Sequence, residues 1–192
     1  MKTDIILAGV GGQGIISIAA AIGLAALNED LVMRQAEVHG MSQRGGAVQS
    51  HLRISSGQIA SDLIPLGKAD LIVSVEPMES LRYLPYLSAN GWLVTSEVPF
   101  INIDNYPDIE TVLGEVKKLQ HHILMNADAI AKKAGSVRSS NMVVLGAASR
   151  FIAIQPENFE RAIRDMFMKK GQEIVKINLE AFRMGRDCAS VN

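Results

Sequence analysis

The stretch from Asp4 to Gly14 constrains the fold more than any other part of the chain. An apolar run leads there directly into the glycine-rich sequence Gly9-Val10-Gly11-Gly12-Gln13-Gly14, and Ile15–Leu27 then reads as a helix. Glycines at the first, third and sixth positions of this loop allow a tight turn, close approach of the backbone to an anion and close packing of the helix. Because free N–H groups and the positive end of such a helix would face the loop, the pattern indicates a phosphate-bearing ligand.

No charged side chain occurs between Ile5 and Asn28, a length that would also suit a membrane span. The glycines divide this stretch into a strand and a helix of about four turns, which is too short to cross a bilayer. No small-residue cleavage site follows a compact apolar core, as it would in a signal peptide. We therefore expect no membrane association.

Length, net charge and cysteine content limit the number of domains, the kinds of partner and the location that can be expected. A chain of 192 residues is expected to form one domain, residues 1–192, with a substantial core. A formal net charge of −1 gives no electrostatic footprint for nucleic acid, so no nucleic-acid partner is expected. The single cysteine, Cys188, cannot form an internal disulfide or a metal cluster, which favours a reducing, cytoplasmic location.

The rest of the chain alternates strand-like apolar runs with helical patterns, as in a layered α/β domain. We expect strands at 31–38, 47–54, 58–64, 69–75, 92–96 and 122–125, with 47–54 and 58–64 paired as a hairpin. We expect helices at 15–27, 77–90, 107–119, 127–134 and 142–152, then an amphipathic helix around 159–167 and, separated from it by Gly171, a last helix that ends near Gly185. The predicted fold is a single Rossmann-like three-layer domain with a mostly parallel sheet, a β-hairpin insertion and C-terminal helices.

The second polar stretch argues against a plain dinucleotide-binding unit. Glu37 lies about 20 residues after the glycine loop, where dinucleotide-binding folds place an acid for the ribose. The following sequence, His39-Gly40-Met41-Ser42-Gln43-Arg44-Gly45-Gly46, is a polar loop at the point where the next helix should begin. It leads into a predicted hairpin, whereas a doubly wound fold requires a crossover helix.

These two glycine-rich stretches, in this order, closely resemble the small (gamma-type) subunit of the 2-oxoacid:ferredoxin oxidoreductases, and most of all that of the indolepyruvate enzymes. The resemblance extends over essentially the whole chain, including Ala69-Asp70-Leu71-Ile72 through Glu76-Pro77 and the run Leu84-Pro85-Tyr86-Leu87. Either glycine stretch alone would be unspecific, but the two together are not.

The resemblance implies a division of labour between subunits. A large partner subunit would carry thiamine diphosphate with Mg and the Fe–S clusters, decarboxylate the 2-oxoacid and pass electrons to ferredoxin, while coenzyme A takes the acyl group. The small subunit would hold no redox cofactor of its own. The sequence agrees, since one cysteine cannot supply the roughly four thiolates that an iron–sulfur cluster needs.

The candidate ligand or interface residues are glycines and polar residues in the two glycine stretches and at the end of strand 69–75. They are Gly9, Gly11, Gly12, Gln13, Gly14, Glu37, His39, Ser42, Gln43, Arg44, Gly45, Gly46 and Glu76. No catalytic residue and no metal ligand is assigned to this chain. The glycines of the first loop serve either a bound ligand or only the turn from strand to helix.

The polar candidates also have two interpretations each. Arg44 either binds a carboxylate or phosphate or pins its loop to the partner, and the interface role is favoured because arginine is enriched at interfaces. His39 is more readily a structural hydrogen bonder than an acid–base group. Glu76 either faces a ligand at the carboxyl edge of the sheet or neutralises the start of the helix at Pro77. His51 is expected on a solvated or interface face of its strand.

Two alternatives to the accessory subunit remain open at this point: an independent NAD(P)- or flavin-dependent dehydrogenase, and a non-enzymatic nucleotide- or coenzyme A-binding module. For the accessory subunit we expect a large, permanent interface in a symmetric α2β2-type assembly, because the helices 15–27 and 142–152 are both strongly apolar. The alternative is that a central sheet covers both helices. We also expect the loop 39–46 to project from the sheet edge toward the active-site region of the partner.

Overall fold

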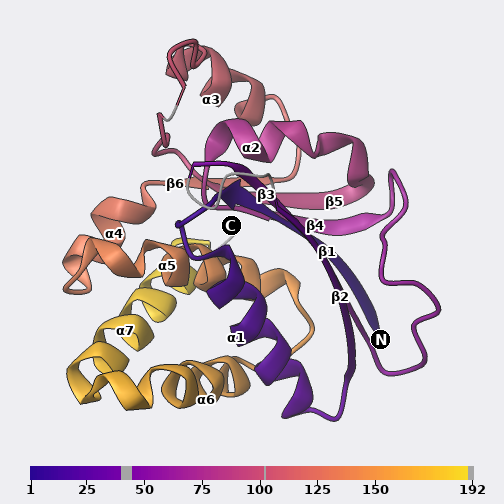
Figure 1. Ribbon diagram of the computed structural model, residues 1–192, viewed down its shortest axis with the longest axis vertical. Helices are drawn as coiled ribbons and strands as arrows, with labels where there is room; N and C mark the ends of the chain where they lie inside the picture. Colours follow the sequence, from indigo (N-terminus) through magenta and orange to yellow (C-terminus); the bar gives the residue numbers. More distant parts are fainter. Residues whose placement is uncertain (40–44, 102, 190–192) are drawn as a thin grey trace.

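A six-stranded sheet in the order β2-β3-β1-β4-β5-β6 forms the centre of the molecule. The computed structural model describes residues 1–39, 45–101 and 103–189 (Figure 1). Strands β1, β4, β5 and β6 run parallel, while β3 is antiparallel to both of its neighbours, β1 and β2. Helices cover both faces of the sheet, which confirms the predicted single α/β domain with a mostly parallel sheet.

The sheet and its helices alternate along the chain. The strands are β1 (Lys2–Val10), β2 (Val32–His39), β3 (Ala47–Ser55), β4 (Ala69–Ser74), β5 (Leu87–Ser96) and β6 (His122–Met125). The helices are α1 (Ile15–Leu27), α2 (Pro77–Arg82), α3 (Ile109–Lys117), α4 (Ala127–Lys133), α5 (Ser140–Ala148), α6 (Pro156–Phe167) and α7 (Gln172–Cys188). Short 3₁₀ turns are η1 (Leu84–Tyr86), η2 (Val137–Ser139), η3 (Ser149–Phe151) and η4 (Met168–Lys170).

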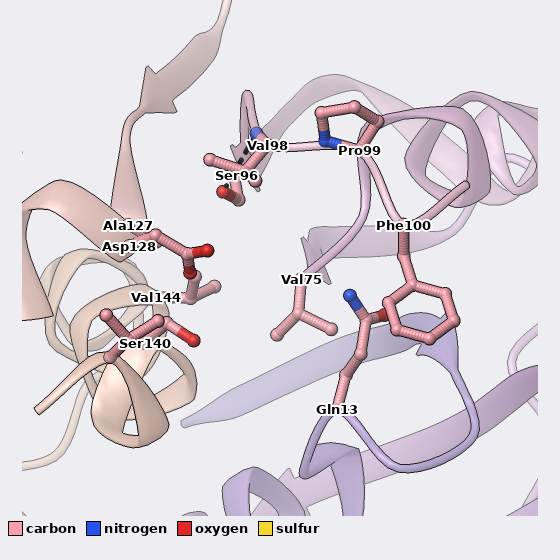
Figure 2. Close-up of a pocket in the computed structure, with 11 residues that line it drawn as sticks. Gln13, Val75, Ser96, Val98, Pro99, Phe100, Ala127, Asp128, Ser140 and Val144 are labelled. Carbon is pink, nitrogen blue, oxygen red and sulfur yellow. Dashed lines mark hydrogen bonds between the residues drawn. The ribbon is translucent and has the colours of Figure 1, made fainter. Parts of the chain in front are cut away.

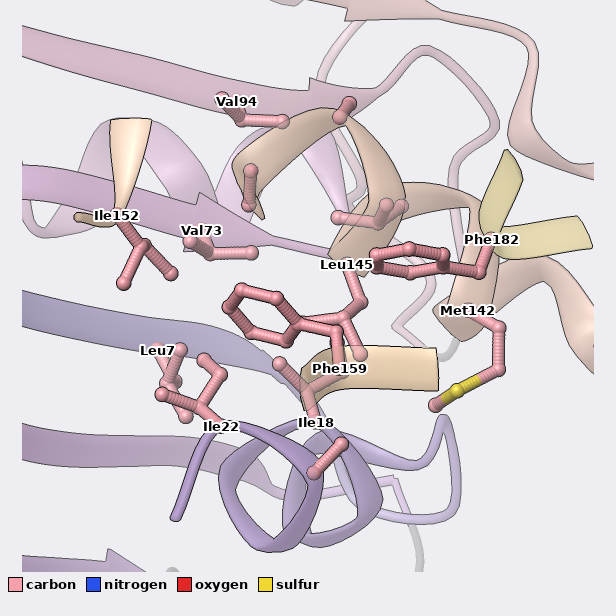
Figure 3. Packing of buried hydrophobic residues seen from close by; sticks show 14 of the residues in the cluster. Leu7, Ile18, Ile22, Val73, Val94, Met142, Leu145, Ile152, Phe159 and Phe182 are labelled. Atoms are coloured by element: carbon pink, nitrogen blue, oxygen red, sulfur yellow. The ribbon is translucent and has the colours of Figure 1, made fainter. Parts of the chain in front are cut away.

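Successive residues of the central strands enter different cores, because side chains alternate across a sheet. Ile5 and Leu7 of β1 belong to the larger core, with residues of α1, α5, α6 and α7. Ile6, between them, belongs to the smaller core on the side of α2 and α3. Phe159 of α6 and Phe182 of α7 stack in the larger core, with ring centroids 5.8 Å apart (Figure 3). The continuous apolar runs of the sequence are therefore strands that are covered on both faces.

Helix α5 lies inside this larger core rather than on the surface. All its residues from Asn141 to Ala148 are buried, and α5 and α7 pack backbone to backbone. The expectation that this apolar segment offers an interface to a partner is wrong, because the sheet and α7 already cover it. Helix α1 is buried on one side only and exposes Ile16 and Leu27. Among the described residues, no helix is long and apolar enough to cross a membrane.

The predicted hairpin is formed by other segments than expected. Strand β3 pairs with β2 on one side and with β1 on the other, so it has no free edge for residues 58–64. Those residues form no strand and instead cross over the face of β3. Arg53 holds them there by donating from Nη1 to the carbonyl oxygens of Ser61 and Leu63, at 2.9 and 3.0 Å. The ring of His51 lies beneath this segment and is buried, not solvated, because its Nδ1 accepts the N–H of Ile64.

The helix that begins at Pro77 is shorter than predicted. It ends at Arg82, and the 3₁₀ turn Leu84–Tyr86 follows. Pro85 explains this end, because proline lacks an N–H and disfavours the α conformation of the residue before it. Strand β5 consequently starts at Leu87, five residues before the predicted start, and its register with β4 shifts between Ala69 and Leu71.

Candidate functional site

The first glycine stretch forms a fixed turn between β1 and α1. The side chain of Gln13 closes it, since its Oε1 accepts the N–H of Val10 at 2.8 Å. Gly14 precedes α1 with φ of 84°, and a Cβ there would overlap the side-chain amide of Asn141. Asn141 at the start of α5 also donates from Nδ2 to the carbonyl oxygen of Gly14, at 3.3 Å. Only glycine fits this position, and the turn is held by a residue 127 positions away.

The two glycine stretches meet in space. The N–H of Gly11 donates to the carbonyl oxygen of Gly46 at 2.9 Å, and the N–H of Gly45 donates to that of Gly11 at 3.4 Å. The end of the second stretch is thereby attached to the middle of the first, at the carboxyl end of β1. Residues 40–44, and with them Ser42, Gln43 and Arg44, lie outside the described residues, as does the side chain of His39. The expected projection of this loop toward a partner therefore stays a prediction.

Glu37 lies near the carboxyl end of β2, where it pairs in register with Ser50 of β3. Its Oε2 accepts a long hydrogen bond, 3.4 Å, from Nε2 of Gln35, which also donates to Oγ of Ser50 at 3.1 Å. In a dinucleotide-binding fold, the second strand is the direct neighbour of the first. Here β3 separates β2 from β1, so the sheet order gives no support to a ribose contact by Glu37 beside the glycine loop.

Glu76 follows β4 and is completely buried. Its carboxylate caps α2 by accepting the N–H of Glu79 at 2.7 Å, as the helix-start interpretation predicts. It also accepts the N–H of Phe100 at 3.4 Å and the hydroxyl of Tyr106. Burial raises the pKa of the Glu76 carboxyl, and the hydrogen bonds from Tyr106 and the backbone oppose that rise. Glu76 thus anchors the segment after β5 to the start of α2.

A cavity of about 200 Å³ lies where β1, β4, β5 and β6 end (Figure 2). This carboxyl edge is where open parallel sheets bind ligands. Gln13 and Phe100 border it on one side, and Asp128 and Ser140 lie across from them. Its lining consists of Gln13, Val75, Ser96, Val98, Pro99, Phe100, Ala127, Asp128, Val137, Ser140 and Val144. Its walls are mostly apolar, with polar side chains at Gln13, Ser96, Asp128 and Ser140, which is the usual composition of a small-molecule binding cavity.

Exposed apolar side chains surround this edge. Ile101 is 70% exposed, and Phe100 and Ile103 from the same segment are exposed as well. Val137, which lines the cavity, and Val38, near the carboxyl end of β2, add to them. Apolar side chains gathered beside a site mark an interaction surface more often than isolated ones do.

Several residues of this edge escaped the sequence reasoning. Asp128 and Ser140 reach the cavity from the starts of α4 and α5, and Tyr106 reaches Glu76 from the irregular connection between β5 and α3. A usable signal existed for Asp128, because it closely follows the strand 122–125 and the carboxyl ends of parallel strands meet at one edge. The described residues contain no group of three His, Cys, Asp or Glu side chains placed to hold a metal ion. Cys188 is exposed and forms no disulfide.

Comparison with protein families gives one match over nearly the whole chain. Residues 4–188 match the family described as pyruvate ferredoxin/flavodoxin oxidoreductase. Among curated proteins, the indolepyruvate oxidoreductase subunit IorB of Archaeoglobus fulgidus is 37% identical, over 96% of this chain and 94% of that protein. The protein of the same name from Methanothermobacter thermautotrophicus is 36% identical, over 99% of both.

Two solved structures are similar to this fold over nearly the whole chain. The gamma subunit of a keto/oxoacid ferredoxin oxidoreductase from Geobacter sulfurreducens superposes with a TM-score of 0.72 over 97% of this chain and 98% of that one, and at 24% identity it speaks for the fold alone. The 2-oxoglutarate:ferredoxin oxidoreductase of Magnetococcus marinus, with 2-oxoglutarate, coenzyme A and succinyl-CoA bound, matches with a TM-score of 0.77 and 26% identity over 98% of this chain. The present chain spans only 31% of the length of that longer chain.

Proposed function

The chain belongs to the pyruvate ferredoxin/flavodoxin oxidoreductase family, as a subunit of a 2-oxoacid:ferredoxin oxidoreductase, and we propose that its complex acts on indolepyruvate or a related aryl pyruvate. One observation carries the choice of substrate. Relatives named indolepyruvate oxidoreductase subunit are 33–37% identical over at least 95% of this chain. Relatives named 2-oxoglutarate synthase subunit KorC are 26–28% identical over a similar length.

The proposed reaction is the oxidative decarboxylation of the 2-oxoacid to an acyl-coenzyme A, with transfer of the electrons to ferredoxin. In this proposal thiamine diphosphate, Mg²⁺ and the iron–sulfur clusters reside in a large partner subunit of a cytoplasmic α2β2-type complex. The composition of this chain supports that division, because a single cysteine cannot hold a cluster that needs about four thiolates. Coenzyme A is a co-substrate of the complex.

The contribution of this chain lies in its carboxyl edge. The two glycine stretches are hydrogen-bonded to each other there, beside the cavity and the exposed side chains of Phe100, Ile101 and Ile103. We place the partner subunit over this edge, with Arg44 of the second stretch as one of its contacts. The alternative of an independent dinucleotide-dependent dehydrogenase is disfavoured, because β3 separates Glu37 from the strand that carries the glycine loop.

The test is reconstitution with the large subunit. We expect the purified 192-residue chain to be colourless and inactive, and the complex to be brown and to reduce a viologen dye only with 2-oxoacid, thiamine diphosphate and coenzyme A present. Values of kcat/KM for indolepyruvate, pyruvate and 2-oxoglutarate then rank the substrates. Dye reduction by the isolated chain would refute the division of labour, and a higher kcat/KM for 2-oxoglutarate would refute the substrate.

The second test concerns Arg44. Arg44→Ala should leave the chain folded but lower the activity of the complex, through weaker assembly or a misplaced substrate, and kcat and KM distinguish these. Arg161→Ala is the matched control, since Arg161 is an exposed arginine of α6 that does not line the cavity at the carboxyl edge. Normal assembly and wild-type turnover of Arg44→Ala over a range of coenzyme A concentrations would contradict this role.

A further inference from the structure

The cavity at the carboxyl edge has the size of a site for one side chain. Its volume of about 200 Å³ lies below the range of roughly 300–1,000 Å³ that is usual for small-molecule sites. Its apolar walls include the buried side chains of Val75, Ala127 and Val144, and the ring of Phe100 borders it (Figure 2). Walls of this kind fit the methylene stem of a long side chain that carries a charge at its end.

The cavity contains one negative charge without a counter-charge. Asp128 is the only charged residue among the described residues that line it, and its carboxylate points into the cavity (Figure 2). Within the described part of the chain Asp128 takes part in no ion pair, not even with Lys132 one helical turn further along α4. A half-buried carboxylate attracts a cation more strongly than one in bulk water. The cavity therefore fits a positively charged group.

The other groups of the cavity favour a guanidinium over an ammonium group. The hydroxyl of Ser140 lies on the same side as Asp128 and offers a further acceptor, while Phe100 lies across from them (Figure 2). A planar guanidinium has five donors and stacks on an aromatic ring, whereas an ammonium is a strongly hydrated point charge. Gln13 uses its Oε1 for the N–H of Val10, so its Nε2 is left to donate to a main-chain carbonyl beside the entering side chain.

The surroundings of the cavity indicate that a protein carries this cation. Ile101 is 70% exposed, and Phe100, Ile103 and Val137 are exposed as well. In protein interfaces, an anchoring side chain sits in a central pocket, and surrounding contacts exclude water from it. A small free cation would fill the pocket but leave these apolar side chains in water.

We propose that this cavity receives an arginine side chain of the large partner subunit, with Asp128 as its ion-pair partner and Phe100 as its stacking partner. The inference rests on the proposed function, in that it takes the occupant from the subunit placed over this edge. Arginine is enriched at interfaces and among their strongest contacts, which agrees with this choice. Asp128 then makes the edge selective for a partner that presents a cation at this point.

The experiment measures the dissociation constant of the large subunit and the 192-residue chain by calorimetric titration at several salt concentrations. Asp128→Asn keeps the shape of the side chain and removes its charge. We expect it to weaken association at least about tenfold and to reduce the dependence on salt, because one partner of a desolvated charge pair is lost. Asp128→Lys should weaken association further, since two cations then meet. Phe100→Leu, which removes only the ring, should weaken it about two- to fivefold.

Glu157→Gln is the matched control. Glu157 is an exposed acid in the first turn of α6, as Asp128 is an acid in the first turn of α4, and it does not line the cavity. Both substitutions remove a carboxylate from the positive end of a helix and should lower the melting temperature of the chain by a similar small amount. Only Asp128→Asn should weaken association, which separates the support of a helix from the contact with a partner.

Two results would overturn the proposal while the wild-type complex still forms and turns over. One is unchanged association of both Asp128 variants: with an unchanged KM for the 2-oxoacid the carboxylate only supports α4, and with a raised KM the cavity takes the substrate. The other is tighter association of Asp128→Asn, which means that the occupant is apolar or anionic. A wild-type chain that does not associate with the large subunit at all would instead refute the proposed function, and this inference with it.

Discussion

The contact between α5 and α7 has no room for a side chain at Gly146. A Cβ at this position would overlap the carbonyl oxygen of Phe182 and lie 2.9 Å from the backbone nitrogen of Arg186, whereas ordinary contacts begin at 3.4 Å. Gly185 is in the reciprocal position, 2.7 Å from the carbonyl carbon of Val143 by the same construction. Because the obstructing atoms are helical backbone, rotation of a side chain cannot relieve the overlap. Gly146→Ala must therefore push the two helices apart.

The magnitude follows from two opposing effects. Overpacking of a core costs about 1–3 kcal/mol, and an overlap with backbone atoms belongs at the upper end of that range. Replacing glycine by alanine inside a helix stabilises the helix by about 1 kcal/mol. The net loss in the free energy of unfolding is then about 2 kcal/mol, which for a chain of this length lowers the melting temperature by about 4–8 °C.

The measurement is urea unfolding of the wild type, Gly146→Ala and a control, Gly114→Ala. Gly114 is also inside a helix, α3, but a Cβ there would meet nothing within 4 Å. The control should gain up to about 1 kcal/mol, since only the helix preference acts. The two alanine substitutions are thus expected to change stability in opposite directions. A Gly146→Ala variant at least as stable as the wild type would refute the close contact of α5 and α7.

Three further predictions concern buried polar groups. Burial, with a smaller effect of Arg53, lowers the pKa of His51, so the unfolded chain binds more protons and the free energy of unfolding falls as the pH drops below about 6.5. His51→Gln should flatten this part of the dependence of stability on pH, measured by urea titrations. An unchanged slope would contradict this prediction. Arg53→Met removes the bidentate partner of the buried Asp4 carboxylate but leaves Lys2, whose Nζ lies 2.7 Å from Asp4 Oδ2, so it should cost about 1–3 kcal/mol, partly recovered by Asp4→Asn. A loss well below about 1 kcal/mol in thermal unfolding would speak against this. Tyr106→Phe removes a hydroxyl that donates to buried Glu76, and this should lower the free energy of unfolding by about 1–3 kcal/mol. Proteolysis within residues 97–106 should become faster. An unchanged rate of cleavage would count against Glu76 as the anchor of this segment.

Much of the fold was predictable because its signals are local. The strand 122–125 was predicted with the observed bounds, and the apolar run from 69 and the helix 15–27 were confirmed, since burial on both faces and glycine punctuation act within a few residues. The prediction for 58–64 was wrong because β3 is already paired on both sides, and within this segment only Ile64 is buried. No local pattern in the sequence shows which strand edges are already occupied.

The amino-acid sequence alone predicts most of the strands and helices, the glycine turn before α1 and, through its resemblance to a known family, the class of complex to which the chain contributes. These follow from residue type and from spacing over short distances. The folded chain was needed to show that β3 separates β2 from β1, that Gly11 is hydrogen-bonded to Gly46, and that Ser139 lies buried beside the glycine loop. Strand order and the meeting of distant loops depend on which of many possible long-range contacts bury the most surface, and no short stretch of sequence records that choice.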